Sequence, residues 1–250
     1  MFKNNFFLTE NNIIYGRNPV LELLKSNKRS INKIILSKTA RGAKISEIVN
    51  LAKKIGVSIH NVPPKKLDGF SKNSQGVLAD VSPIKYVDLR KSIEKAKIAH
   101  KSLFVILDGI NDPHNFGAII RNCVVFDVDS IIVPKWRAVG VNNTVVKSSS
   151  GAVEYISISR VSNINQTISL LKKNGFLIIA GVQSDGCTLE KINLYFPMAI
   201  IIGNEGLGVS CLTRKKCDFL ISIPQKKEIS SLNASCASAI ILYEISKARL

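Results

Sequence analysis

The chain has 250 residues, which is enough for one large domain or two small ones, each with a real hydrophobic core. Hydrophobic residues make up 46% of it, an ordinary share for an α/β protein, and no apolar run is long enough to span a membrane. The formal net charge of +17 favours a polyanionic partner, with RNA or DNA ahead of an acidic membrane, although a general bias toward lysine would produce a similar excess.

The positive charge lies mainly in the first part of the chain. Residues 1–100 contain 19 Lys and Arg against 7 Asp and Glu, whereas residues 101–250 contain 16 against 11. We expect residues 1–12 to be an N-terminal tail, with no secretory signal, so a cytoplasmic location is the default. The five cysteines form no CxxC pair, which indicates free thiols, and the three scattered histidines indicate no metal site.

Residues 13–87 are predicted to form a compact α/β unit. A helix is expected to open near Gly16, with Asn18 as a possible N-cap and Pro19 in the first turn. The other expected elements of this unit are a strand at 33–36, a helix at 43–55 stopped by Gly56, and strands at 57–62 and 76–81. Basic loops between the strands suit contacts with RNA phosphates, although a solvated surface would also explain each lysine: Lys65, Lys66 and Lys72.

Residues 88–101 are charged and weakly helical, and they are predicted to be a linker between two domains. From Leu103 onward, apolar segments of strand length alternate with helical patterns, which predicts a mostly parallel sheet. The expected elements are strands at 103–107, 130–133, 153–158, 176–180, 198–202 and 219–223, helices at 118–126, 164–173 and from 234 onward, and a serine-rich turn at 148–151.

Three loops of this second region follow apolar sequence and gather glycine, amide, hydroxyl and acidic groups. These loops are 108–117, 203–208 and the segment that reaches 231–233. Open α/β sheets bind ligands at loops that follow the carboxyl ends of strands. We therefore expect the three loops to meet at one crevice.

Asn115 and Arg121 are candidates for gripping a nucleotide, because an amide can hold a ribose hydroxyl while a cation holds the adjacent phosphate. Taken singly, Asn115 is better explained as a turn or cap residue and Arg121 as a surface ion pair.

Glu205 lies in the run GNEGLG (203–208), which is neither the GxGxxG dinucleotide pattern nor a Walker loop. A carboxylate among glycines would repel phosphate, so the loop suits a cofactor that carries positive charge. The alternative is a glutamate that caps a helix starting near Val209. Ser231 and Asn233 can face the same crevice, although both are also ordinary N-cap residues.

Three runs resemble the signature motifs of the SpoU (TrmH-type) branch of the SPOUT RNA methyltransferases: DGINDPHNFGAIIRN, IIGNEGLGVS and IPQKKEISSLNASCASAIILYE. The N-terminal runs YGRNPVLELL and NSQGVLADV resemble the L30e-like substrate-binding domain of that family. The resemblance covers residues 13–250. It implies an L30e-like RNA substrate-binding domain at 13–87 and a SpoU methyltransferase domain at 102–250, whose C-terminal helix is tucked through an earlier loop in a trefoil knot.

The same resemblance implies an activity and a site. Members of the family use S-adenosylmethionine to methylate a ribose 2′-hydroxyl of RNA, without a metal, and act as homodimers that complete the site across the interface. By resemblance, the active-site positions are Asn115, Arg121, Glu205, Ser231 and Asn233, and the cofactor is bound by Gly203, Ile223 and Leu232 with Gly181 close by. Two departures, Val182 in place of a more usual Thr and the apolar run at 139–141, affect only details of cofactor binding.

The two-domain layout is most similar to that of the 23S rRNA guanosine 2′-O-methyltransferases, so 23S rRNA is the expected partner. A tRNA 2′-O-methyltransferase shares all three motifs and remains an alternative, as does a non-catalytic RNA-binding protein. A nucleotide-dependent oxidoreductase lacks its glycine fingerprint and is the least favoured.

Overall fold

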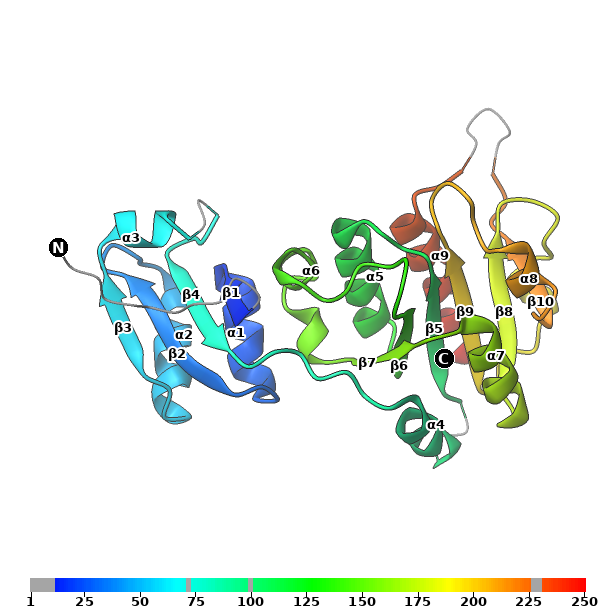
Figure 1. Ribbon diagram of the computed structural model, residues 1–250, viewed down its shortest axis with the longest axis horizontal. Helices are drawn as coiled ribbons and strands as arrows, with labels where there is room; N and C mark the ends of the chain where they lie inside the picture. Colours follow the sequence, from blue (N-terminus) through cyan, green and yellow to red (C-terminus); the bar gives the residue numbers. More distant parts are fainter. Residues whose placement is uncertain (1–11, 71–72, 99–100, 226–230) are drawn as a thin grey trace. The chain divides into compact units, whose positions relative to one another are not determined.

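The computed structural model describes residues 12–70, 73–98, 101–225 and 231–250. The chain divides into two compact units, Met1–Lys85 with Val141–Tyr155 and Tyr86–Gly140 with Ile156–Leu250 (Figure 1). Among the described helices, none is both long enough and apolar enough to cross a membrane. Lys72, one of the lysines expected to contact RNA, lies outside the described residues.

The first unit contains a four-stranded mixed sheet in the order β1-β4-β2-β3. The middle pair, β4 and β2, is antiparallel; β1 is antiparallel to β4, and β3 is parallel to β2. The bounds are β1 Ile13–Tyr15, β2 Ile31–Ser37, β3 Ile59–Val62 and β4 Val77–Val81, with helices α1 Arg17–Ser26, α2 Ala43–Lys54 and α3 Pro64–Asp68. Lys65 and Lys66 lie in α3 and are exposed.

The start of α1 differs from the sequence prediction. Gly16, at φ 100°, is the N-cap, and no side chain caps the helix. Asn18 lies inside the first turn, where its Oδ1 accepts a hydrogen bond from Lys44 Nζ at 2.6 Å. The prediction of Asn18 as N-cap is therefore wrong, because its side chain is used to hold α2 beside α1.

The segment Val141–Tyr155 lies in sequence between two strands of the second sheet, yet it packs in the first unit. The serine-rich turn predicted at 148–151 is confirmed, since residues 149–151 form a turn directly after α6 Asn143–Ser148. The early start of the next strand is wrong: the 3₁₀ turn η2 spans Ala152–Glu154, and β7 begins only at Ser157. Helix α6 begins at an asparagine cap, because Asn142 Oδ1 accepts from Val145 N at 3.0 Å. The strand starts late because Val153 and Glu154 are buried within η2.

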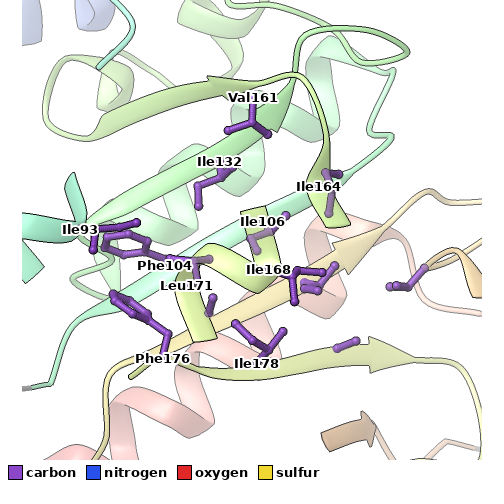
Figure 2. Close-up of a cluster of buried hydrophobic side chains, with 14 of the residues drawn as sticks. Ile93, Phe104, Ile106, Ile132, Val161, Ile164, Ile168, Leu171, Phe176 and Ile178 are labelled. Carbon is purple, nitrogen blue, oxygen red and sulfur yellow. The ribbon is translucent and has the colours of Figure 1, made fainter. Parts of the chain in front are cut away.

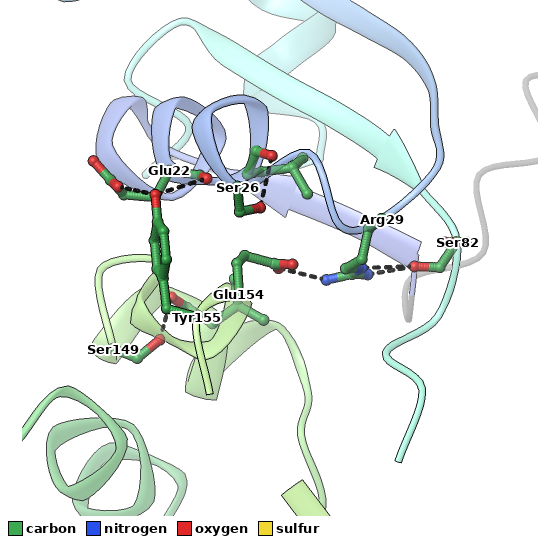
Figure 3. A network of polar contacts seen from close by, with 9 residues as sticks. Glu22, Ser26, Arg29, Ser82, Ser149, Glu154 and Tyr155 are labelled. Atoms are coloured by element: carbon green, nitrogen blue, oxygen red, sulfur yellow. Dashed lines mark hydrogen bonds and ion pairs between the residues drawn. The ribbon is translucent and has the colours of Figure 1, made fainter. Parts of the chain in front are cut away.

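A buried ion pair fixes this segment in the first unit (Figure 3). Arg29 Nη1 lies 2.8 Å from Glu154 Oε1, and the two side chains are only 10% and 1% exposed. Arg29 also donates to the carbonyl oxygen of Ser82, and Tyr155 Oη donates to Glu22 Oε2 at 2.7 Å. Burial raises the pKa of Glu154, and the neighbouring Arg29 opposes that rise.

The second unit contains a six-stranded sheet in the order β10-β8-β9-β5-β6-β7, in which every neighbouring pair is parallel. This confirms the predicted mostly parallel sheet. The bounds are β5 Leu103–Asp108, β6 Ser130–Pro134, β7 Ser157–Val161, β8 Leu177–Val182, β9 Met198–Gly203 and β10 Phe219–Ser222. From β5 the chain connects toward β6 and β7, whereas from β9 it connects toward the opposite edge, to β10. The boundary between β5 and β9 is therefore a topological switch point, where open α/β sheets bind ligands.

One face of this sheet is covered by α4 Leu89–Ile98 and α7 Ile164–Lys173 (Figure 2). Alternate residues of β5, Phe104 and Ile106, face the buried Ile168 of α7 in this cluster. Ile93 and Ala96 of α4 are buried in the same cluster. Residues 89–98 therefore form a helix that packs on the second unit through its apolar face. The charged residues on its other face are the reason why the sequence pattern resembles a linker.

Helices α5 Pro113–Val125 and α9 Ala234–Arg249 pack against each other, and α9 also contacts β9. The predicted start of α5 at 118 is wrong, because Asp112 caps a helix that begins at Pro113, five residues before 118. Its carboxylate accepts from His114 N at 3.0 Å and from Asn115 N at 3.3 Å, and Pro113 occupies the first helical position. The remaining short elements are η3 Leu189–Lys191 and α8 Cys211–Arg214.

Candidate functional site

A pocket opens at the carboxyl ends of β8, β9 and β10 and against the start of α9. Because the strands are parallel, their carboxyl ends meet at one edge of the sheet, as the sequence predicts for the loops. The lining includes six of the predicted residues: Gly181, Gly203, Glu205, Ile223, Ser231 and Leu232. Apolar groups that the sequence analysis did not single out, Ala237 and Ile241 of α9, complete the wall.

Gly203 permits the tight loop that follows β9. A Cβ atom at this position would lie 2.3 Å from the backbone carbon of Gly208, far inside van der Waals contact. The loop closes on itself there, since Gly208 N donates to Asn204 O at 2.8 Å and Gly208 takes a φ of 65°. Both glycines are thus required by the backbone geometry of this loop.

Asn204 shapes the same loop, although the sequence analysis assigned it no role. Its Oδ1 accepts from Gly206 N at 2.9 Å and Leu207 N at 3.2 Å, and its Nδ2 donates to Gly109 O at 2.8 Å. The loop after β9 is therefore tied to the loop after β5. An asparagine that precedes a glycine-rich turn is the signal that could have found it.

Asn115 in the first turn of α5, Glu205 in the loop after β9 and Asn233 at the start of α9 form a continuous series of hydrogen bonds. Asn115 Nδ2 donates to Glu205 Oε1 at 2.7 Å, and Asn233 Nδ2 donates to Asn115 Oδ1 at 3.0 Å. Asn233 also caps α9, because its Oδ1 accepts from Ser235 N at 2.8 Å. Glu205 is not a helix cap, since Ser210 caps α8. The structure thus brings three predicted site residues together and orients the Glu205 carboxylate with neutral amides.

Arg121 lies apart from this group. It is exposed on α5 and does not line the pocket. The next residue, Asn122, faces α9 and donates to Ser235 O at 2.9 Å and Ser238 Oγ at 3.1 Å. Successive helical side chains are about 100° apart, so Arg121 points away from that contact. Within the described ranges, no hydrogen bond or ion pair engages its guanidinium group.

The charge of the pocket is opposite to that of the whole chain. Among the described residues that line it, Glu205 carries the one charge, and none is Lys or Arg, although the chain carries a net charge of +17. The aliphatic side chains of Ile223, Leu232 and Ile241 supply apolar walls. Such a pocket fits a small ligand with an apolar ring and a positive charge, and it disfavours phosphate. In the described part of the chain, no group of His, Cys, Asp and Glu is placed to hold a metal ion.

The second unit is an α/β fold with a pocket at its strand ends, which is where such sheets bind ligands. Residues 102–243 match the SpoU rRNA Methylase family, and residues 13–87 match a family described as RNA 2′-O ribose methyltransferase substrate binding. The chain therefore belongs to the SpoU family of RNA methyltransferases, whose methyl donor is S-adenosylmethionine.

Curated relatives and solved structures agree with this membership. A Staphylococcus saprophyticus protein assigned to the TrmH family of tRNA/rRNA methyltransferases is 38% identical and covers 95% of this chain and 96% of its own length. YacO of Bacillus subtilis, assigned to the same family, is 36% identical and covers 96% of this chain and 97% of its own length. The crystal structure of the SpoU methyltransferase AviRb from Streptomyces viridochromogenes, in complex with AdoMet, has the same fold, with a TM-score of 0.80 at 23% identity, over 95% of this chain and 90% of that one.

Proposed function

We propose that this protein transfers a methyl group to the ribose 2′-hydroxyl of a guanosine in 23S rRNA, as RlmB-type enzymes do. The observation that carries the proposal is the series of hydrogen bonds from Asn233 through Asn115 to Glu205, at the rim of a pocket in which Glu205 is the one charged residue among the described lining residues. The match of residues 13–87 to a substrate-binding family of RNA 2′-O ribose methyltransferases supports the ribose as the target. The tRNA/rRNA names of the relatives keep tRNA as the alternative substrate.

The pocket residues divide into two groups with different tasks. Gly181, Gly203, Ile223 and Leu232 hold S-adenosylmethionine against backbone and aliphatic surface, where Gly203 allows the close approach of the loop. The bound donor supplies an electrophilic methyl group on a positively charged sulfur. Glu205, fixed by Asn115, provides a compensating negative charge beside it.

Arg121 acts on the RNA side. A guanidinium remains protonated near neutral pH, so we assign it the role of orienting the target ribose and binding the neighbouring phosphate, with a phosphate oxygen or water accepting the proton. Asn115, Ser231 and Asn233 position the ribose. Catalysis then depends mainly on alignment of the attacking oxygen, which is a proximity effect. The exposure of Arg121 on α5, outside the pocket of its own chain, fits a homodimer in which each subunit completes the site of its partner.

The rest of the molecule takes the roles that the family resemblance implies. We propose that residues 13–87 capture RNA, that residues 102–250 form the methyltransferase domain with a knotted C-terminus, and that the homodimer works in the cytoplasm. The exposed Lys65 and Lys66 of α3 are consistent with phosphate contacts in the first domain.

The activity is tested with labelled S-adenosylmethionine and unmodified 23S rRNA and tRNA. We expect label in ribose 2′-O-methylguanosine of 23S rRNA, and a loss of at least about a hundredfold in rate for Arg121→Ala, with little rescue by Arg121→Lys. Arg90→Ala, which removes an exposed arginine of α4, is the matched control and should leave the rate unchanged. Label on tRNA alone would identify tRNA as the substrate in place of 23S rRNA. Absence of transfer to either RNA would reject the enzymatic proposal.

Calorimetry with S-adenosylmethionine distinguishes the proposed enzyme from a non-catalytic RNA-binding protein. The enzyme binds S-adenosylmethionine at one site per chain, whereas a protein that only binds RNA shows no heat with the donor. Mapping of 2′-O-methyl groups in the rRNA and tRNA of a deletion strain then identifies the nucleotide that loses its methyl group.

A further inference from the structure

Trp136 is the one tryptophan of the chain, and its side chain is 72% exposed. It is the second residue after β6 and lies between Lys135 and Arg137, which are also exposed. An indole ring normally contributes a large buried area to a core. Its exposure between two cations therefore marks a contact surface, which we name the 135–137 loop.

The backbone of the 135–137 loop is held on both sides. Lys135 N donates to Val161 O at 2.8 Å, and Arg160 Nη2 donates to Lys135 O at 2.9 Å. Val139 N donates to Ile110 O at 3.1 Å just beyond the loop. An aromatic side chain on a fixed backbone loses little conformational entropy when it binds, so the loop is a prepared platform.

The loop lies beside the pocket loops. Strands β5 and β6 are neighbours, and the loops that follow them meet. A Cβ atom added to Gly109 would lie 3.9 Å from Arg137 O. Gly109 O accepts from Asn204 Nδ2 at 2.8 Å, and Asn204 precedes Glu205. A short series of contacts thus joins the tryptophan loop to the candidate active site.

The charges around Trp136 select the class of partner. In the described part of the chain, neither Lys135 nor Arg137 forms an ion pair, so these two cations remain available to a ligand. Arg160 is already engaged, since it donates to Lys135 O and lies over the Tyr86 ring. A base can stack on an indole ring, and adjacent cations bind the phosphates on either side of it. The core of a protein–protein interface is instead depleted in charged residues, lysine in particular. An unpaired RNA strand is the partner that matches this loop.

We propose that Trp136 stacks on an unpaired base next to the methylated nucleotide, while Lys135 and Arg137 bind the flanking phosphates. The proposal rests on the proposed function, because it specifies how RNA reaches that site. It makes Trp136 a residue that binds the RNA and leaves the methyl donor untouched.

The single tryptophan also provides the probe. Full-length protein is titrated with a mixed-sequence 12-nucleotide RNA, single-stranded or annealed to its complement, and the tryptophan emission is recorded. We expect quenching by the single strand and much weaker quenching by the duplex. The Trp136 variants contain no tryptophan, so their affinities are compared with the wild type by the fluorescence anisotropy of the same RNA carrying a 5′ dye. Trp136→Ala should lower the affinity for the single strand about fivefold to a hundredfold, with Trp136→Phe intermediate, because base–aromatic stacking contributes about 1–3 kcal/mol.

Controls separate this proposal from its alternatives. Tyr195→Ala removes another exposed aromatic ring with a lysine over it, Lys101 Nζ at 4.7 Å from the centroid, and should not change RNA affinity. S-adenosylmethionine affinity should stay unchanged in Trp136→Ala. Unquenched emission with RNA bound, or wild-type affinity in Trp136→Ala, would overturn the proposal. Dissociation of the protein into monomers by Trp136→Ala would assign the ring to a second copy of the chain. Failure of the proposed function is seen separately, as absence of methyl transfer by the wild type.

Discussion

Two glutamates, one in each unit, show opposite uses of a carboxylate. Glu154 in the first unit is 1% exposed in its side chain and lies 2.8 Å from the Arg29 guanidinium. Glu205 in the second unit is exposed and is held by the neutral amide of Asn115 at 2.7 Å. In the described ranges no cation pairs with Glu205.

The difference separates a structural charge from a functional one. A buried carboxylate is tolerated when a cation and further hydrogen bonds satisfy it, and then little of its charge acts on the surroundings. A carboxylate oriented by amides keeps its full charge for a ligand. We therefore expect changes at Glu154 and Arg29 to act on stability, and changes around Glu205 to act on donor binding.

The largest effect on donor binding is expected from Gly203→Ala. The added Cβ would lie 2.3 Å from the backbone of Gly208, so the loop that carries Glu205 must open. We expect a loss of at least about a hundredfold in S-adenosylmethionine affinity, about 2.7 kcal/mol, measured by calorimetry. Gly206→Ala in the same loop is the control, because its Cβ would meet no atom closer than 3.6 Å and should bind normally. Equal affinity in the two variants would contradict the loop geometry.

Arg29→Ala should destabilise the fold without acting on the pocket. It leaves Glu154 buried and unpaired, and we expect the free energy of unfolding in urea at neutral pH to fall by about 3–5 kcal/mol. Burial already raises the pKa of Glu154, and loss of Arg29 raises it further. A carboxyl whose pKa is raised by folding stabilises the fold below its unfolded pKa and loses that contribution as pH rises through the folded pKa.

The loss in Arg29→Ala should accordingly shrink as pH falls, because the buried carboxyl takes up a proton. Arg29→Ala/Glu154→Gln removes the charge and is expected to recover part of the stability at neutral pH with a flatter pH dependence. A loss that is the same at every pH would show that Glu154 is not the cause.

Glu205→Gln should lower the affinity for the donor and leave the stability of the fold unchanged, the opposite of what we expect for Arg29→Ala. The substitution keeps the oxygen that accepts from Asn115 and removes the negative charge. Because Glu205 is exposed, we expect a fall in S-adenosylmethionine affinity of roughly threefold to tenfold, with the free energy of unfolding unchanged. Glu154→Gln is the matched control and should leave donor affinity as in the wild type. The contrast between the two glutamates fails if both variants bind the donor equally.

A similarly small effect is expected for the coupling between Asn115 and Asn233. Their side chains share one hydrogen bond of 3.0 Å. A double-mutant cycle with Asn115→Ala and Asn233→Ala, read as donor affinity, should give a coupling of about 0.5–1.5 kcal/mol. Additive effects would mean that the two residues act on the pocket independently.

Local sequence patterns predict most strands and several helices because they depend on neighbouring residues. Helix α7 begins and ends where its periodicity predicts, at Ile164–Lys173, and β5 and β9 are continuous apolar runs. The convergence of the three loops also follows from parallel strands and their shared carboxyl edge. The start of α5 was missed because Asp112 and Pro113 resemble a loop, although together they cap a helix.

Contacts between distant residues could not be predicted in the same way. Arg29 and Glu154 are 125 positions apart, and nothing in either local run indicates the other. The membership of Val141–Tyr155 in the first unit has the same origin, since it depends on contacts such as that of Tyr155 with Glu22. The position of Arg121 on a different face from Asn115 was missed together with the start of α5, because the predicted helix began at 118 and left Asn115 outside it. In the observed helix, six residues correspond to one full turn plus about 240° of rotation.

Hydrogen–deuterium exchange of the full-length protein with and without S-adenosylmethionine tests the central claim most directly. The claim is that the pocket after β8, β9 and β10 holds the methyl donor. It predicts protection of 181–183, 203–208 and 231–241 on donor binding, with exchange in 13–81 unchanged. Protection confined to the first unit, or no protection at 203–208 at a donor concentration that saturates binding, would contradict it.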